Sequence, residues 1–122
     1  MVLCLGVNDI DIGCRTADQL LGDLQSIIKG LKSHNPSVDI MLCTVPPFNF
    51  AEEREHVWRT VNERIRSQGL EGVSRVFDIA EVLSQPAPNE HLLQPRFMSS
   101  EFDPHPNGLA GTEIAKAFIR WY

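Results

Sequence analysis

The chain has 122 residues, of which 43% are hydrophobic and 22% are charged, and its formal net charge is −5. A chain of this length forms one domain and can bury roughly two-thirds of its unfolded surface. Lys and Arg form no cluster, so neither nucleic acid nor an anionic membrane is predicted as a partner. No apolar run is long enough to span a bilayer, and no secretory signal is visible. The cellular location stays open, with the cytoplasm slightly favoured.

The cysteines indicate neither a zinc site nor a disulfide framework, because their number is odd and no CxxC motif occurs. Cys4 and Cys43 lie in apolar runs, where a free cysteine usually behaves as a small buried hydrophobic residue. The four histidines do not have the spacing of metal ligands. No glycine-rich phosphate loop occurs either, so we expect no metal, nucleotide, flavin or other cofactor.

The first half of the chain reads as two strands separated by a helix. Residues 1–7 (MVLCLGV) form a continuous apolar run, which is typical of a strand covered on both faces. A helix is expected from the capping residue Thr16 to about His34, because apolar residues follow Thr16 at helical spacing. Residues 38–45 (VDIMLCTV) predict a second strand that stops at Pro46. Both strands are expected to lie in the centre of a sheet.

The second half contains two helices, one strand and a long polar segment. Residues 52–68 form an amphipathic pattern that closes at Gly69, as a helix does. Residues 72–79 predict a shorter strand nearer the edge of the sheet. Residues 84–104 hold several prolines without periodicity, which predicts a long loop of functional importance or mobility. Residues 109–122 predict a final helix.

Strands that alternate with helices predict an α/β fold with a parallel sheet and right-handed crossovers. In such sheets ligands bind outside the carboxyl ends of the strands. That edge is predicted to carry Asn8 and Asp9 after the first strand and Pro46 to Asn49 after the second. The loop with Asp103 and His105 is expected to join them along one rim.

Two sequence blocks resemble those of a known family. Gly6-Val7-Asn8-Asp9 follows an apolar strand, and Asp103-Pro104-His105-Pro106-Asn107 precedes the last helix. In this order the blocks are similar to the later blocks of the SGNH (GDSL-type) hydrolases. The resemblance implies a flavodoxin-like, three-layer α/β/α fold, of which residues 1–122 would form the C-terminal part, with the last three strand-helix units. It also implies a lipase-like serine esterase, a thioesterase or an acyltransferase that acts on a small acyl ester.

The resemblance assigns roles to individual residues. His105 resembles the general base of a serine hydrolase, and Asp103 the carboxylate that orients it. Asn8 resembles an oxyanion-hole donor, and an amide held at the end of a rigid strand needs little reorganisation when the oxyanion forms. Further residues are candidates for the substrate pocket: Gly6, Asp9, Pro46 and Phe48.

The sequence departs from the family pattern in two ways. No Gly-Asp-Ser block occurs, so we expect the nucleophile upstream of this chain or on a companion polypeptide, and we interpret the chain as a fragment, a truncated polypeptide or one piece of a two-chain enzyme. The family usually spaces its last block Asp-x-x-His, whereas Asp103 lies one residue closer to His105. Phe102 occupies the expected Asp position.

Other readings of the same residues stay open. Asn8 and Asp9 also suit a turn or cap, and His105 an ordinary loop histidine. The chain as a whole also suits a non-catalytic module that lost its nucleophile and binds a companion chain, or a second copy, through residues 1–7. A small flavodoxin-like ligand-binding domain is a further alternative. The remaining histidines are expected at the surface: His34, His56 and His91.

Overall fold

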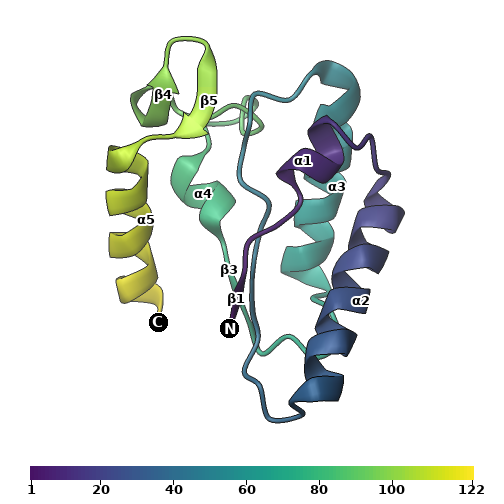
Figure 1. The fold of residues 1–122 in the computed structure, drawn as a ribbon. Helices are drawn as coiled ribbons and strands as arrows, with labels where there is room; N and C mark the ends of the chain where they lie inside the picture. Colours follow the sequence, from purple (N-terminus) through teal and green to yellow (C-terminus); the bar gives the residue numbers. More distant parts are fainter.

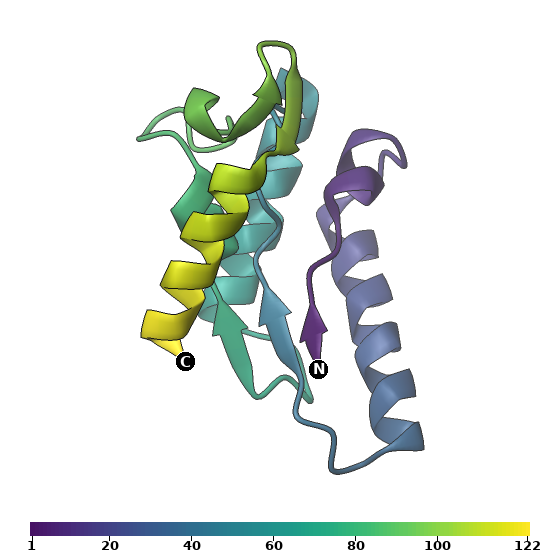
Figure 2. The same ribbon diagram turned by 60° about the vertical axis from the view of Figure 1, so that its left-hand side comes forward.

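The computed structural model describes all 122 residues and confirms the three-layer α/β/α architecture. Its central sheet contains β1 (Val2–Leu3), β2 (Met41–Cys43) and β3 (Arg75–Phe77), in the order β1-β2-β3. Both strand pairs are parallel, and Figure 2 shows the three strands pointing the same way. The carboxyl ends of the strands therefore meet at one rim, as the sequence predicted.

Helices α2 (Ala17–His34) and α3 (Glu52–Ser67) cover one face of the sheet (Figure 1). Apolar side chains of both helices recur at helical spacing, and they pack against the residues of β2 that point to the same side. The main members of this half of the core are Leu20, Leu24, Leu42, Val45, Trp58, Val61 and Ile65.

None of the helices is long and apolar enough to cross a membrane.

The opposite face is covered by α4 (Ile79–Leu83) and α5 (Gly108–Trp121). A 3₁₀ helix, η1 (Pro95–Phe97), leads into the antiparallel hairpin of β4 (Met98–Ser100) and β5 (Asp103–Pro106). This half of the core contains Met41, Cys43, Phe77, Leu83, Leu93, Phe97 and Ala110.

The three long helices are where the sequence predicted them. Thr16 forms a capping box with Gln19, because each side chain bonds to the other residue's backbone N–H. Gly69 follows the end of α3 with a φ of 64°, a conformation that glycine adopts without steric cost. Asn107 caps α5, since its side chain accepts a hydrogen bond from the Ala110 N–H at 3.0 Å.

The expectation for residues 1–7 was wrong in two respects. The strand ends at Leu3, and Val7–Asp11 forms a short helix, α1, so Asn8 and Asp9 lie in a helical turn. Gly6 makes the turn into α1, because its φ of 120° redirects the chain. The strand also lies at an edge of the sheet and not at its centre, and Met1 and Val2 are 57% and 55% exposed.

Other boundaries also differ from the prediction. The second strand spans only residues 41–43, in the centre of the sheet as expected, and the third lies at the sheet edge, also as expected. The segment 84–104, predicted as a loop, contains η1, β4 and the start of β5. The residues Ile79–Leu83 form the helix α4, whose carboxylate cap, Asp78, accepts a hydrogen bond from the Glu81 N–H. Short elements with little periodicity leave no reliable pattern in a sequence.

Two side chains lie elsewhere than predicted. Cys4 is exposed, because no strand covers β1 on its outer side, whereas Cys43 is buried as expected. The His91 side chain is only 14% exposed, and its Nδ1 lies 3.3 Å from Glu55 Oε1. His91 is therefore a largely buried partner of α3 and not a surface residue.

A clamp from α3 holds the chain where it leaves β2. Asn62 is fully buried, its Oδ1 accepts a hydrogen bond from the Val45 N–H at 2.7 Å, and its Nδ2 donates to the Val45 carbonyl at 2.9 Å. Trp58 Nε1 donates to the carbonyls of Val45 at 2.9 Å and Pro46 at 3.2 Å. The polar backbone that follows β2 is thus satisfied inside the core.

Replacing the clamp amide should destabilise the whole domain. In Asn62→Ala the buried Val45 N–H loses its acceptor and a small cavity forms, so the free energy of unfolding should fall by about 2–3 kcal/mol. Urea unfolding followed by tryptophan fluorescence measures this loss. The matched control is Asn89→Ala, an exposed position expected to change stability by less than about 0.5 kcal/mol. Equal effects of the two substitutions would contradict the role of the clamp.

Candidate functional site

A pocket of about 340 Å³ lies at the carboxyl ends of β1 and β2. It brings together the residues that the sequence selected at three separate places: Gly6 to Asp9, Pro46 to Phe48, and His105. Asp103 does not line the pocket and lies behind His105. The remaining lining residues are Cys4, Leu5 and Pro106.

His105 and Asp103 form a direct pair within β5. The Nδ1 of His105 lies 2.5 Å from Asp103 Oδ1, and the same oxygen accepts a hydrogen bond from the His105 N–H at 3.0 Å. Hydrogen bonding by the imidazole, followed by that of the backbone N–H, lowers the pKa of Asp103 below its usual value of 3.8. With Nδ1 engaged by the carboxylate, Nε2 is the ring nitrogen left for a reacting group. The one-residue spacing therefore still permits the contact.

Phe48 supports the imidazole from the neighbouring loop. The two rings meet edge to face, with centroids 5.0 Å apart and an interplanar angle of 84°. Asn49 anchors this loop, since its Oδ1 accepts from the Leu93 N–H at 2.9 Å and its own N–H donates to the His91 carbonyl at 3.2 Å. Its φ of 54° is one that asparagine tolerates better than most residues. The sequence pattern placed Asn49 at this edge of the sheet but did not reveal its anchoring role.

Asn8 and Gly6 form the other wall of the pocket. Asn8 is exposed in the first turn of α1, and its side chain makes no hydrogen bond within the chain. Gly6 is buried, and a Cβ at this position would lie 2.9 Å from Val45 Cγ2. The fully buried Ile10 anchors α1 to the core. The amide of Asn8 is thus presented by a fixed turn and is free to donate to a bound group.

The pocket combines a carboxylate-paired imidazole with a free amide donor. Such a set can accept a proton at Nε2 and donate a hydrogen bond to a developing oxyanion. The hydroxyl of Ser99, which lies on the same hairpin, donates to the His105 carbonyl at 2.8 Å, and Ser99 does not line the pocket. No group of three or more His, Cys, Asp or Glu side chains is placed to hold a metal ion.

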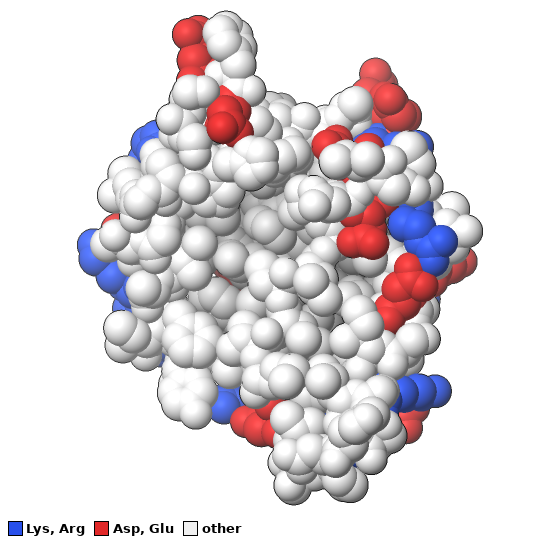
Figure 3. All heavy atoms as spheres, viewed as in Figure 1, with Lys and Arg blue, Asp and Glu red and all other residues white.

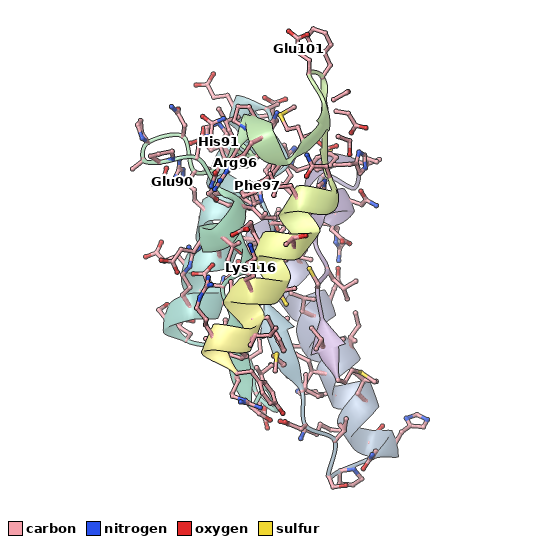
Figure 4. The ribbon with its side chains drawn as sticks, turned by 90° about the vertical axis from the view of Figure 1, so that its left-hand side faces the viewer. Glu90, His91, Arg96, Phe97, Glu101 and Lys116 are labelled. Carbon is pink, nitrogen blue, oxygen red and sulfur yellow. The ribbon has the colours of Figure 1, made fainter.

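A second, larger cavity of about 1140 Å³ lies between α3, α4 and residues 84–96. Its charges largely neutralise one another: Arg59 pairs with Glu90 at 3.0 Å, and Arg66 pairs with Asp78 at 2.7 Å. Figure 4 shows Glu90 on the segment that leads to η1 and Arg96 within η1 itself. No histidine lines this cavity, and the smaller pocket is the candidate site.

Comparisons with known proteins were made for the sequence and for the fold. No family model matches the sequence, and no curated protein matches it. The fold matches the crystal structure of a carbohydrate esterase family 3 from Talaromyces cellulolyticus, with a TM-score of 0.68 and 20% sequence identity. The match covers 96% of this chain and 53% of that chain, so this chain spans about half the esterase's length. The chain therefore shares its fold with part of an esterase.

Alanine substitutions at Gly6 and at Gly22 should change the stability of the fold in opposite directions. Gly6→Ala should destabilise the fold by about 2–4 kcal/mol, because the substitution combines a strained φ with a close contact to Val45. Gly22→Ala is the control. Gly22 lies in α2, where an added Cβ would meet open space, so the substitution should stabilise the fold by about 0.5–1 kcal/mol. Thermal and urea unfolding distinguish the two. A neutral Gly6→Ala would show that the turn adapts.

The pair in β5 can be tested by titration. In His105→Ala the carboxylate loses its imidazole partner, so the pKa of Asp103 should rise towards 3.8. Carbon-13 NMR of the carboxyl group measures this pKa directly. His34→Ala, which removes an exposed imidazole elsewhere, should leave the titration unchanged. If His105→Ala also left it unchanged, the ring and the carboxylate would not meet in solution.

Proposed function

We propose that this chain supplies the acid–base and oxyanion-binding part of a serine ester hydrolase. One observation carries the proposal: the imidazole of His105, paired with Asp103 at 2.5 Å, opens on the same pocket as the unpartnered amide of Asn8. The esterase that shares the fold supports it. The nucleophilic serine then belongs to residues outside these 122.

The proposed reaction begins when His105 Nε2 accepts the proton of the serine hydroxyl as the oxygen attacks the acyl carbonyl. The oxyanion of the tetrahedral intermediate accepts a hydrogen bond from the Asn8 amide, and Asp103 stabilises the imidazolium. His105 then returns the proton to the leaving alkoxide, and an acyl-enzyme is left. Water hydrolyses that ester with the same imidazole as base, whereas a second alcohol in place of water would give acyl transfer.

The outer edge of β1 is the place where we expect the nucleophile-bearing segment to pair. Nothing in the chain covers this edge, and Met1, Val2 and Leu5 are 57%, 55% and 44% exposed. The face seen in Figure 3 carries its charged side chains mainly at the margins, with an uncharged centre. A parallel strand added here would hydrogen-bond to β1 and end beside the pocket. A serine at its carboxyl end would then face His105.

The substrate class that we propose is a small acyl ester, and the description of the matching esterase favours an ester of a carbohydrate. Phe48 and the two prolines before it offer an apolar wall to the acyl group. A thioester would react by the same steps.

A second candidate function is a non-catalytic module that binds a partner or a second copy through β1. The same exposed edge favours it, because unpaired strands with apolar neighbours tend to associate. Native mass spectrometry and fluorophosphonate labelling discriminate between the two. A self-associated chain without a labelled serine on any companion polypeptide supports the module.

The hydrolase proposal predicts the effects of two substitutions on hydrolysis of p-nitrophenyl acetate by the enzyme that contains this chain. His105→Ala removes the general base and should lower kcat at least about 1000-fold. Asn8→Ala removes one oxyanion donor and should lower kcat by about 100- to 1000-fold with little change in KM.

The matched controls are His34→Ala and Asn89→Ala, which lie outside the pocket and should retain full activity. Circular dichroism checks that each variant is folded. Unchanged turnover in a folded His105→Ala enzyme would refute the proposal. A rise in KM with kcat unchanged for Asn8→Ala would assign that residue to substrate binding and not to the oxyanion.

A further inference from the structure

The chain contains a pair of thiols that the proposed hydrolase does not use. Cys4 follows β1 at the wall of the pocket, where it is exposed, and Cys43 is the last residue of β2 and is buried. Cys14 is a third free thiol, exposed and separate from the other two. One chain thus holds a paired and a solitary exposed cysteine.

Cys4 and Cys43 directly follow the last pair of the β1–β2 ladder. Val2 pairs with Met41 and Leu3 with Leu42 in parallel, and Cys4 and Cys43 are the next residues along the two chains. Side chains at paired positions point to the same face of a sheet, and neighbouring strands lie about 4.8 Å apart. That separation falls inside the range of about 4.4–6.8 Å over which Cα atoms are joined by a disulfide.

The two thiols also influence each other's ionisation. Hydrogen bonding by the Cys43 thiol outweighs burial and lowers the pKa of Cys4 to about 7. The pKa of Cys43 is raised, first by its interaction with Cys4 and then by burial. The exposed partner is therefore the nucleophilic thiolate at neutral pH, and the buried partner keeps its proton.

We propose that Cys4 and Cys43 are a redox-active pair at the wall of the pocket, which a hydroperoxide converts to a disulfide. The inference uses only the geometry of these two residues and does not depend on the hydrolase proposal. Its reactant is a small peroxide, because Cys4 is exposed at the wall of the pocket whereas Cys43 is buried.

The reaction has two steps. The Cys4 thiolate attacks one oxygen of hydrogen peroxide and the O–O bond breaks. A sulfenic acid forms, and the hydroxide that leaves takes up a proton to become water. The Cys43 sulfur then attacks the sulfenic sulfur, so that an S–S bond forms and a second water leaves with the Cys43 proton. Overall, two thiols are oxidised by two electrons and one peroxide is reduced to two waters.

The disulfide would join the end of β1 to β2 two residues before Gly6. This turn positions α1 and therefore Asn8. Oxidation would thus add a covalent restraint to the wall of the pocket that carries the amide donor, and reduction would remove that added restraint.

The first experiment measures the rate of alkylation by iodoacetamide at each cysteine of the 122-residue chain as a function of pH, by peptide mass spectrometry. The rate at Cys4 should have a midpoint near pH 7. Cys43→Ala should move the Cys4 midpoint to about 8.5 or above, because burial, which raises the pKa, is then unopposed. Near neutral pH Cys4 should therefore react about threefold faster in the unsubstituted chain than in Cys43→Ala, since a larger thiolate fraction is partly offset by lower nucleophilicity. Equal profiles in the two chains would overturn the proposal.

The second experiment treats the chain with hydrogen peroxide and maps the product. We expect the loss of two hydrogen atoms in mass, a Cys4–Cys43 linked peptide, and reversal by dithiothreitol. Cys43→Ser, which keeps a hydrogen-bond donor but has no sulfur, should yield Cys4 sulfenic acid and no internal disulfide. Over-oxidation of Cys4 in the unsubstituted chain, or a disulfide to Cys14 or to a second chain, would overturn the pairing.

Discussion

The hydrogen bonds from α3 to the backbone of Val45 are the constraint on which the rest of the structure depends. Asn62 accepts a hydrogen bond from the N–H of that residue and donates one to its carbonyl, to which Trp58 also donates. The backbone can therefore leave the central strand while it is still buried, without an unsatisfied polar group. The Val45 side chain in turn lies so close to Gly6 that it leaves no room for a Cβ there. One clamp thus fixes both the loop with Phe48 and the turn that leads to Asn8.

The imidazole of the pocket is placed by contacts from a different part of the chain. The β4–β5 hairpin carries His105 at its end and is held to the core by Phe97, which is fully buried, and by the Asn107 cap of α5. Figure 4 shows Glu101 at the tip of this hairpin, beyond the end of α5 that carries Asn107. The edge-to-face contact with Phe48 joins the imidazole to the loop that follows β2. The position of His105 relative to this loop therefore depends on Asn49, which anchors it.

Sequence reasoning succeeded where periodicity or capping was strong. The helices that begin after Thr16 and Asn107 have both signals, and the parallel order of the sheet follows from alternation. It failed after β1 because a glycine with positive φ can turn the chain inside an apolar run. The hairpin within residues 84–104 was missed because its strands are too short to alternate clearly. Site residues at strand ends were found together, whereas Asn49 and Asn62 act through buried backbone, which no motif reveals.

The uncovered edge of β1 explains why the pocket has one finished wall and one open side. Every group on the finished wall is held by the chain's own core, through Ile10, Val45 and Phe48. On the open side, the ring of His105 is 70% exposed and its Nε2 has no protein partner. An imidazole that is oriented by a carboxylate and free at its second nitrogen can bond to a further group. Because the exposed strand edge and the free nitrogen adjoin the same pocket, the added strand that we propose would satisfy the backbone of β1 and bring its carboxyl end beside Nε2.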